Sequence, residues 1–312
     1  MAFYTQIPSG AIRVTGTDRL DFVQGQVSQN IKALPVPGVA RSMILNVKGQ
    51  IEFDVRIYRR ENDICIYTAG GLEDSLLARL QKMIVFDDVK LQDISGNVSV
   101  LHVSGENIEF IHSNIYPTKL HTTPQDVFVC ECLMGFYEKS NGVFLVGNNN
   151  RGNGMGYDIH IETAHFETYC AWLEENGASL LAFSDLEKSR IDAKFPNAHT
   201  DGFTGMLPQE CGLLEGVSFK KGCYVGQEIM ARLEARGHSN KTLVRVSLET
   251  NLETGTIVMC DGREVGQLGH VVPLETGFTA LAVLRIDAFE KPNLEAGGVK
   301  LEVDFSSLSS KL

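Results

Sequence analysis

Apolar residues in the first 240 positions recur with two different periods, that of strands and that of helices. From Ile51 to Tyr58, apolar and polar residues alternate, which is the period of a strand with one buried face. Asp54 and Arg56 then share the other face, which is open to two interpretations, a functional site or a solvated surface. Apolar residues three and four positions apart predict helices that begin near Asp18, Leu72, Phe166 and Ser184. This mixture predicts an α+β fold for the first part of the chain.

Short apolar runs predict further strands, and local signals mark the helix ends. These runs lie at 43–47, 64–68, 98–103, 127–132, 143–146 and 157–161. Gly177 is expected to end the helix that starts near Phe166, and Ser184 with Glu187 forms a capping-box pattern for the next helix. The glycine-rich segment 147–156 lies between two predicted strands, so we expect a hairpin loop rather than a nucleotide-binding loop.

Helical periodicity stops near residue 238. Beyond it, strands are predicted at 243–248, 257–260, 265–272 and 280–286, and the pair Asp261-Gly262 is typical of a two-residue hairpin turn. A length of 312 residues also suits about two domains. We therefore predict a mixed region at 1–238 and a small all-β domain at 239–312.

The composition argues against several classes of protein. Hydrophobic residues make up 43% of the chain and charged residues 21%, which is ordinary for a globular protein with a core. The net charge of −11 disfavours direct binding to nucleic-acid phosphates. No apolar run is long enough to span a membrane, and residues 1–10 lack the pattern of a secretory signal. The seven cysteines include no C-x-x-C pair, which indicates reduced thiols and a cytoplasmic location.

The segment from Phe219 to Glu228 carries the strongest chemical signal. Lys220 and Lys221 precede Cys223, and a helix is predicted to begin shortly after it. Positive charge and a helix N-terminus both favour thiolate over thiol, so we expect the pKa of Cys223 to lie below that of a free cysteine. The alternative is an inert, buried cysteine in a tight turn. The flanking charges and glycines favour the reactive thiol.

Residues 220–228, KKGCYVGQE, resemble the signature of the YgfZ family, a folate-binding branch of the aminomethyltransferase (glycine-cleavage T-protein) superfamily. Four weaker segments follow the order of that family, namely FVQGQVS at 22–28, NVKGQ at 46–50, SRIDA at 189–193 and PQE at 208–210. The resemblance therefore covers most of the chain. It implies two α+β lobes that form a folate-binding region, followed by a C-terminal antiparallel β-barrel.

The resemblance also implies a ligand, partners and a reactive group. The ligand would be tetrahydrofolate or a one-carbon derivative, bound near a central cavity. The family supports assembly or repair of iron–sulfur enzymes, including one that modifies tRNA, so such client enzymes are the expected partners. Cys223 would be the reactive thiol. Lys221 would tune that thiol and could attract the glutamate tail of the folate.

The remaining site residues are carried over from the same resemblance. Asp54 would lie near the reacting one-carbon unit, where a carboxylate can stabilise or relay charge. Asp192 would correspond to a carboxylate that hydrogen-bonds a pterin ring, and Gly222 and Gly226 would shape the loop. The other expected ligand-binding residues are Arg190, Gln209, Glu210, Tyr224, Gln227 and Glu228.

Two departures from the superfamily pattern bear on the reaction. The expected glutamate of the SRIDA element is the shorter Asp192, and the expected pair of acids after the hairpin is Phe53-Asp54. Loss of one acid speaks against aminomethyl transfer. The main prediction is therefore a folate-binding accessory protein that acts on iron–sulfur enzymes and indirectly supports tRNA modification. A tetrahydrofolate-dependent aminomethyl- or methyltransferase and a non-enzymatic folate-binding module are the alternatives.

Other residues that could bind metals give weaker signals. His160 and His165 lack an H-E-x-x-H pattern and are expected to be structural. Cys130 and Cys132 share one face of a predicted strand, which is too few ligands for the usual metal or cluster site. The sequence therefore predicts no resident metal.

Overall fold

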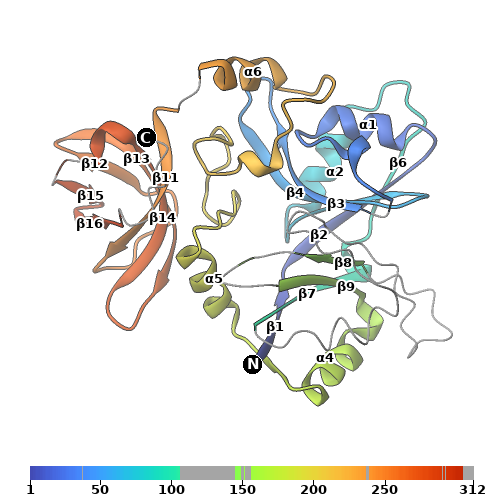
Figure 1. Cartoon of the computed structure of the whole chain (residues 1–312), viewed down its shortest axis with the longest axis horizontal. Helices are drawn as coiled ribbons and strands as arrows, with labels where there is room; N and C mark the ends of the chain where they lie inside the picture. Colours follow the sequence, from blue (N-terminus) through green and yellow to red (C-terminus); the bar gives the residue numbers. More distant parts are fainter. Residues whose placement is uncertain are drawn as a thin grey trace.

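The computed structural model describes residues 1–36, 38–105, 145–148, 151, 156–236, 239–289, 291 and 293–304. The predicted strand at 127–132, with Cys130 and Cys132, lies outside these residues, as does most of the loop at 147–156. The described chain forms two five-stranded sheets and a closed barrel (Figure 1). None of its described helices is long and apolar enough to cross a membrane.

One sheet is built from the strands that follow one another early in the chain. Its order is β3-β4-β5-β2-β6, and all neighbours are antiparallel. Phe22, Val23, Leu76 and Leu80, on two helices, pack into its core because they lie on the apolar faces of these helices. The elements are β2 (Ser9–Thr15), α1 (Arg19–Gln26), β3 (Gly38–Leu45), β4 (Ile51–Arg59), β5 (Ile64–Ala69), α2 (Glu73–Gln81) and β6 (Lys90–Asp93).

The second sheet has the order β10-β1-β7-β9-β8, with β1 parallel to β10 and antiparallel to β7. Tyr169 and Leu173 of helix α4 pack into its core. The elements are β1 (Ala2–Ile7), β7 (Val98–Gly105), β8 (Leu145–Asn148), β9 (Gly156–Glu162), α4 (Phe166–Glu175) and β10 (Ala178–Leu180). The order places β1, the first strand of the chain, next to β7, which forms about 100 residues later.

The two lobes are interlocked through the chain's first two strands. Only Pro8 separates β1 from β2, yet the two strands belong to different sheets. Proline has no backbone N–H and therefore cannot extend a strand ladder in the ordinary way. The chain builds one lobe from β2 to β6 and returns to the other at β7. The predicted α+β architecture of two lobes is confirmed.

The C-terminal part is a closed antiparallel barrel with the order β11-β14-β13-β12-β15-β16. Asp261 and Gly262 have φ angles of 49° and 76°, as a two-residue hairpin turn requires, so the predicted hairpin is confirmed. The sequence pattern did not predict the last two strands, because they are short. The strands are β11 (Lys241–Leu248), β12 (Ile257–Cys260), β13 (Arg263–Pro273), β14 (Phe278–Arg285), β15 (Leu294–Ala296) and β16 (Val299–Val303).

Helix α5 (Phe183–Asp192) connects the lobes to the barrel. Its Ile191 shares a buried cluster with Met43 of β3 and with Leu281 of β14. Arg245 of β11 pairs with Asp192 at the end of α5, with 2.8 Å between the charged atoms. The barrel is therefore fixed to the same helix that contributes to the wall of the lobes. The boundary at residues 238/239 stays a prediction, because residues 237–238 lie outside the described chain.

The capping box predicted at Ser184 and Glu187 is wrong. Helix α5 begins at Phe183, after Ala182, and no side chain caps it. Glu187 is buried and pairs instead with Arg190, at 2.7 Å. A buried guanidinium needs an opposite charge more than an accessible helix end needs a side-chain cap. The remaining helix is α6 (Gln227–Arg236), and single 3-10 turns lie at Ile31–Ala33, Ser95–Asn97, Thr163–His165, Leu214–Gly216 and Ile286–Ala288.

Candidate functional site

A cavity of about 270 Å³ lies where the two sheets, α5 and the loop after α5 meet. Strands β4 and β5 of one sheet line it together with β7 and β9 of the other. Asp54 and Arg56 are both among its lining residues. Their side chains are 9% and 17% exposed, so the solvated-surface interpretation of this strand face is wrong. The polar face of β4 is the floor of a cavity shared by both lobes.

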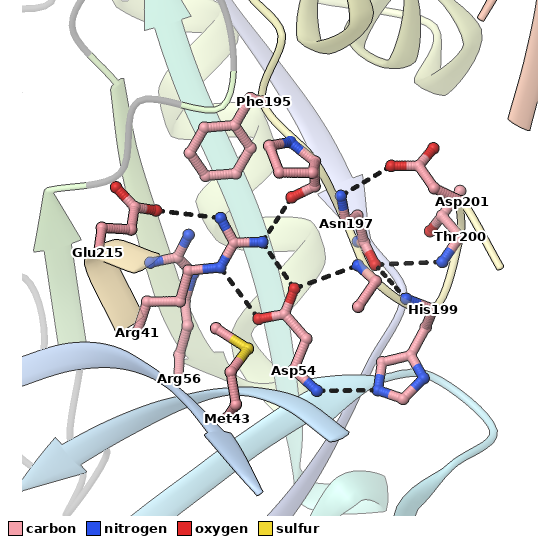
Figure 2. A network of polar contacts seen from close by, with 12 residues as sticks. Arg41, Met43, Asp54, Arg56, Phe195, Asn197, His199, Thr200, Asp201 and Glu215 are labelled. Carbon is pink, nitrogen blue, oxygen red and sulfur yellow. Dashed lines mark hydrogen bonds and ion pairs between the residues drawn. The ribbon is translucent and has the colours of Figure 1, made fainter. Parts of the chain in front are cut away.

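Arg41 and Asp54 form the central ion pair of this wall (Figure 2). Arg41 donates from Nε and Nη2 to the two oxygens of Asp54, at 3.0 and 2.6 Å. Its Nη2 also donates to the carbonyl of Pro196, at 2.5 Å, and Nη1 donates to Glu215. The Phe195 ring packs on the guanidinium, 4.7 Å from its carbon. Burial raises the pKa of Asp54, but the Arg41 charge and the hydrogen bonds from Arg41 and Ala198 together lower it overall.

The loop after α5 is held against β4 by this pair and by its own hydrogen bonds. The backbone N–H of Ala198 donates to Asp54, and the N–H of Asp54 donates to Nε2 of His199. Asn197 accepts from the N–H groups of His199 and Thr200, which makes a tight turn. Figure 2 shows Asn197, His199 and Thr200 around Asp54. Both oxygens of Asp54 are therefore engaged in structural contacts.

Arg190 is the second buried arginine of the wall, and it is only 2% exposed. It forms paired hydrogen bonds with Glu187, at 3.0 and 2.7 Å, and with Asp201, at 2.8 and 3.0 Å. Two carboxylates thus face one guanidinium, which fixes α5 to the loop that Asp54 holds. Four of the five N–H donors of Arg190 make these hydrogen bonds, and the fifth donates to the carbonyl of Phe195.

A second group of charges centres on Asp158 of β9. Arg151 donates to both of its oxygens, His102 lies 2.9 Å from Oδ1, and Arg56 lies 3.8 Å away. Burial raises the pKa of Asp158, but the Arg151 charge and the other neighbours hold it well below its usual range. Asp158 is therefore ionised, and Arg151 and Arg56 share its single negative charge.

Two polar atoms of the cavity-lining residues have no hydrogen-bond partner among the described residues. They are Oγ1 of Thr68 and Nδ1 of His160, and both are buried. The other ring nitrogen of His160, Nε2, lies 2.5 Å from the hydroxyl of Tyr58. Burial lowers the pKa of His160 to about 3, so the imidazole is neutral at neutral pH. Unpaired buried polar atoms are costly, and both residues that carry them here line the cavity.

The motifs at 22–28, 46–50 and 220–228 meet away from this cavity. Lys221 is 8% exposed and its Nζ donates to the carbonyls of Gln24, Val27 and Gln29, at 2.6, 2.6 and 3.0 Å. An ammonium group has three hydrogens, and these three carbonyls use all of them. The Tyr224 ring lies 4.9 Å from Nζ. Burial lowers the pKa of Lys221 to about 8.

The hairpin between β3 and β4 supports the same loop. Gly226 has a φ of +84°, and a Cβ there would lie 2.6 Å from the carbonyl oxygen of Asn46 and 3.1 Å from Cα of Gly49. The two turns therefore approach each other more closely than any side chain allows. Cys223 lies in this loop and is exposed. The loop thus presents the thiol to solvent from a rigid base.

The structure brings the predicted site residues together only in part. Asp54 and Arg190 line the cavity, whereas none of the other predicted residues does. Asp192 pairs with the barrel residue Arg245. The others lie along the segment from Pro208 to α6. Glu210 accepts from the N–H of Leu207, and Oε1 of Gln209 is buried without a partner among the described residues. Tyr224 is buried beside Lys221, whereas Gln227 and Glu228 begin α6, where Glu228 is exposed and pairs with Arg232.

Sequence reasoning missed the residues that complete the cavity. His160 was expected to be structural, yet it lines the cavity. The signal was present, because Asp158 and His160 stand two positions apart in a predicted strand and so share one face. Arg41 had no local signal, since it precedes the apolar run at 43–47 and its partners are remote in sequence.

The fold and the cavity define a class of protein, with two interlocked α+β lobes around a polar cavity and a barrel after them. Comparison with known proteins places the chain within that class. Residues 6–221 match the family described as GCVT N-terminal domain, and residues 240–307 match the one described as CAF17, C-terminal beta-barrel domain. The match to residues 6–221 covers well over half of this chain, so the chain belongs to the GCVT N-terminal domain family.

Similar proteins agree with this assignment. A protein from Hamiltonella defensa subsp. Acyrthosiphon pisum (strain 5AT), named tRNA-modifying protein YgfZ, is 26% identical over 91% of this chain and 86% of its own length. A protein of the same name from Yersinia enterocolitica serotype O:8 / biotype 1B (strain NCTC 13174 / 8081) is 26% identical over 74% of this chain and 66% of its own length, just under two thirds. The resemblance inferred from the motifs is confirmed.

A solved structure shows the same fold. It is the glycine cleavage system aminomethyltransferase T from Bartonella henselae, which superimposes with a TM-score of 0.76 over 97% of this chain and 84% of its own. The two sequences are 14% identical, so this likeness concerns the fold.

Lys221 allows a test against its neighbour Lys220, which is exposed. We expect Lys221→Met to lower the free energy of unfolding by about 2 kcal/mol, because three carbonyls lose their donor. Lys220→Met should change it by less than about 0.5 kcal/mol. Urea unfolding of both variants measures the difference. Equal effects would show that the ammonium does not hold the segment 24–29.

Gly226 and Gly222 form a second matched pair in the same loop. Gly226→Ala should destabilise the protein by about 1–3 kcal/mol, because the new methyl group meets the carbonyl of Asn46 in a backbone conformation that alanine avoids. Gly222 has open space around an added Cβ, so Gly222→Ala should be close to neutral. Thermal unfolding compares them, and a stable Gly226→Ala variant would contradict the close approach of the two turns.

Proposed function

We propose that this protein binds tetrahydrofolate or a one-carbon derivative in the cavity between its lobes. We further propose that it acts in the cytoplasm as an accessory protein for assembly or repair of iron–sulfur enzymes, including one that modifies tRNA. The observation that carries the proposal is the cavity itself, whose lining residues Thr68 and His160 each have a buried polar atom without a partner among the described residues.

The chemistry of the wall fits a folate. A pterin ring is flat and carries both hydrogen-bond donors and acceptors, and ligand sites are typically concave with a few placed polar groups. Thr68 offers a hydroxyl and His160 a ring nitrogen, while Phe195 and Phe183 supply apolar surface. The cavity volume of about 270 Å³ suits one ring system better than a whole folate, so the remainder of the molecule would extend toward the opening.

The contacts of Asp54 favour an accessory role over aminomethyl transfer. A carboxylate that acts as a proton acceptor needs a free lone pair that is aimed at the substrate. Both oxygens of Asp54 already accept from Arg41, and one also accepts from Ala198. The predicted catalytic use of Asp54 thus draws no support from its geometry, and we assign it to the framework of the cavity.

The proposal gives Cys223 the chemical role in the partnership with iron–sulfur enzymes. Its exposure leaves the thiol accessible to a large partner, whereas the cavity lies elsewhere in the lobes. The hydrogen bonds of Lys221 and the packing of Gly226 fix the loop in place. In this view Lys221 positions the thiol, and the predicted attraction of a folate tail by Lys221 is not part of the proposal.

Complementation tests the function directly. In a strain that lacks its own YgfZ-type protein, the wild-type chain should restore activity of an iron–sulfur enzyme that modifies tRNA, and Cys223→Ala should restore less than about a tenth of it. The matched control is Cys170→Ala, which removes a partly buried thiol on α4 and should restore full activity. Equal rescue by Cys223→Ala would remove the thiol from the proposal. Absence of rescue by the wild type, with soluble protein present, would overturn the iron–sulfur role.

A further inference from the structure

The position of one hydrogen atom in the cavity wall can be deduced from the Tyr58–His160 contact. The Tyr58 hydroxyl is buried, and its oxygen lies 2.5 Å from Nε2 of His160. Burial raises the pKa of Tyr58 above its ordinary value, so the phenol keeps its proton. The His160 ring is also packed edge-on against Tyr58 and Tyr67, with centroids 4.4 and 4.2 Å apart. The ring is therefore fixed in orientation.

Only one arrangement of protons satisfies the Tyr58 hydroxyl. Nε2 of His160 is the hydrogen-bond partner that the described chain offers to this hydroxyl. If Nε2 carried the proton, the Tyr58 O–H would be left without an acceptor and Nδ1 would be a second unpaired group. If the Tyr58 O–H donates to Nε2, the neutral ring carries its proton on Nδ1. The second arrangement leaves a single unpaired donor, the Nδ1–H of His160.

We propose that His160 is a specificity-determining residue, which donates a hydrogen bond from Nδ1–H to an acceptor atom of the bound ligand. Tyr58 acts through it, as the positioning residue that fixes the tautomer. Thr68 is the second recognition group, since its hydroxyl can donate or accept. The identity of the ligand as a folate rests on the proposed function. The assignment of the donor does not.

The charges of the wall indicate which chemical class meets this donor. Arg41 pairs with Asp54, Arg190 pairs with Glu187, and Arg151 and Arg56 share Asp158, so each of these guanidiniums has a carboxylate beside it. The unsatisfied atoms belong instead to two uncharged side chains, Thr68 and His160. This part of the cavity therefore selects an uncharged heterocycle with a ring carbonyl or an unprotonated ring nitrogen. A carboxylate or phosphate buried there would have to displace existing ion pairs.

The tautomer can be measured on the protein alone. Histidine-selective ¹⁵N labelling, with His160→Phe to identify the signal, distinguishes an Nδ1–H ring from an Nε2–H ring. We expect the Nδ1–H form in the wild type and a mixture of both forms in Tyr58→Phe, which removes the donor but keeps the ring. An Nε2–H form in the wild type would overturn the proposal without any ligand.

Binding of 5-formyltetrahydrofolate tests the recognition step. Calorimetry should show about tenfold weaker binding for His160→Phe and a similar loss for Thr68→Val, whereas Thr68→Ser should bind like the wild type. Thr68→Val keeps the shape of the side chain, so it provides the test if His160→Phe does not fold. Wild-type affinity in His160→Phe and Thr68→Val would overturn the proposal.

A third probe separates this inference from the proposed function. If the wild type binds no 5-formyltetrahydrofolate, folate binding fails, and 2-pyridone is then titrated as a minimal lactam ring. A shift of the His160 ¹⁵N signal that saturates with 2-pyridone, and that Thr68→Val weakens, would support the donor role with another ligand. No shift would overturn it.

Discussion

The ion pair between Arg41 and Asp54 joins parts of the chain that are far apart in sequence. Through it, strands β3 and β4 hold Pro196 and Ala198 of the loop after α5. That loop in turn presents Asp201 to Arg190 on α5, the helix to which the barrel is fixed. Two coupled, buried ion pairs thus set the distance between the sheet, the loop and the helix. Because removal of one partner would leave a buried charge uncompensated, the cost of changing either pair is large.

In the proposed function, recognition and reactivity belong to different parts of the molecule. The cavity lies between the lobes, and two of its lining residues, Thr68 and His160, have an uncharged, buried polar atom without a partner among the described residues. Cys223 stands in a loop that is anchored by backbone carbonyls around Lys221 and by two glycines in contact. In the proposed function the cavity binds the cofactor while the thiol meets a protein partner. Ser28 also supports the segment that leads to Cys223, because its hydroxyl donates to the carbonyl of Gly216 and its own carbonyl accepts from the N–H of Ser218.

Local patterns predicted the elements well and the site only partly. Alternation along β4 placed Asp54 and Arg56 on one face, and that face lines the cavity. Alternation cannot show what covers a face, so the choice between solvent and cavity stayed open. The partners of Asp54 come from positions 41 and 198, and no periodicity links them. Lys221 lies in the most conspicuous motif of the sequence, yet the motif did not reveal its structural role. Its three partners are backbone carbonyls, which carry no sequence signal.

The most direct measurement is a crystal structure of the protein grown with 5-formyltetrahydrofolate. The predicted result is ring density in the cavity, in contact with His160 and Thr68, with the Arg41–Asp54 pair intact and Cys223 still exposed. Density for the ligand on the Cys223 loop, or an empty cavity with folate bound elsewhere, would contradict the assignment of the cavity as the ligand site.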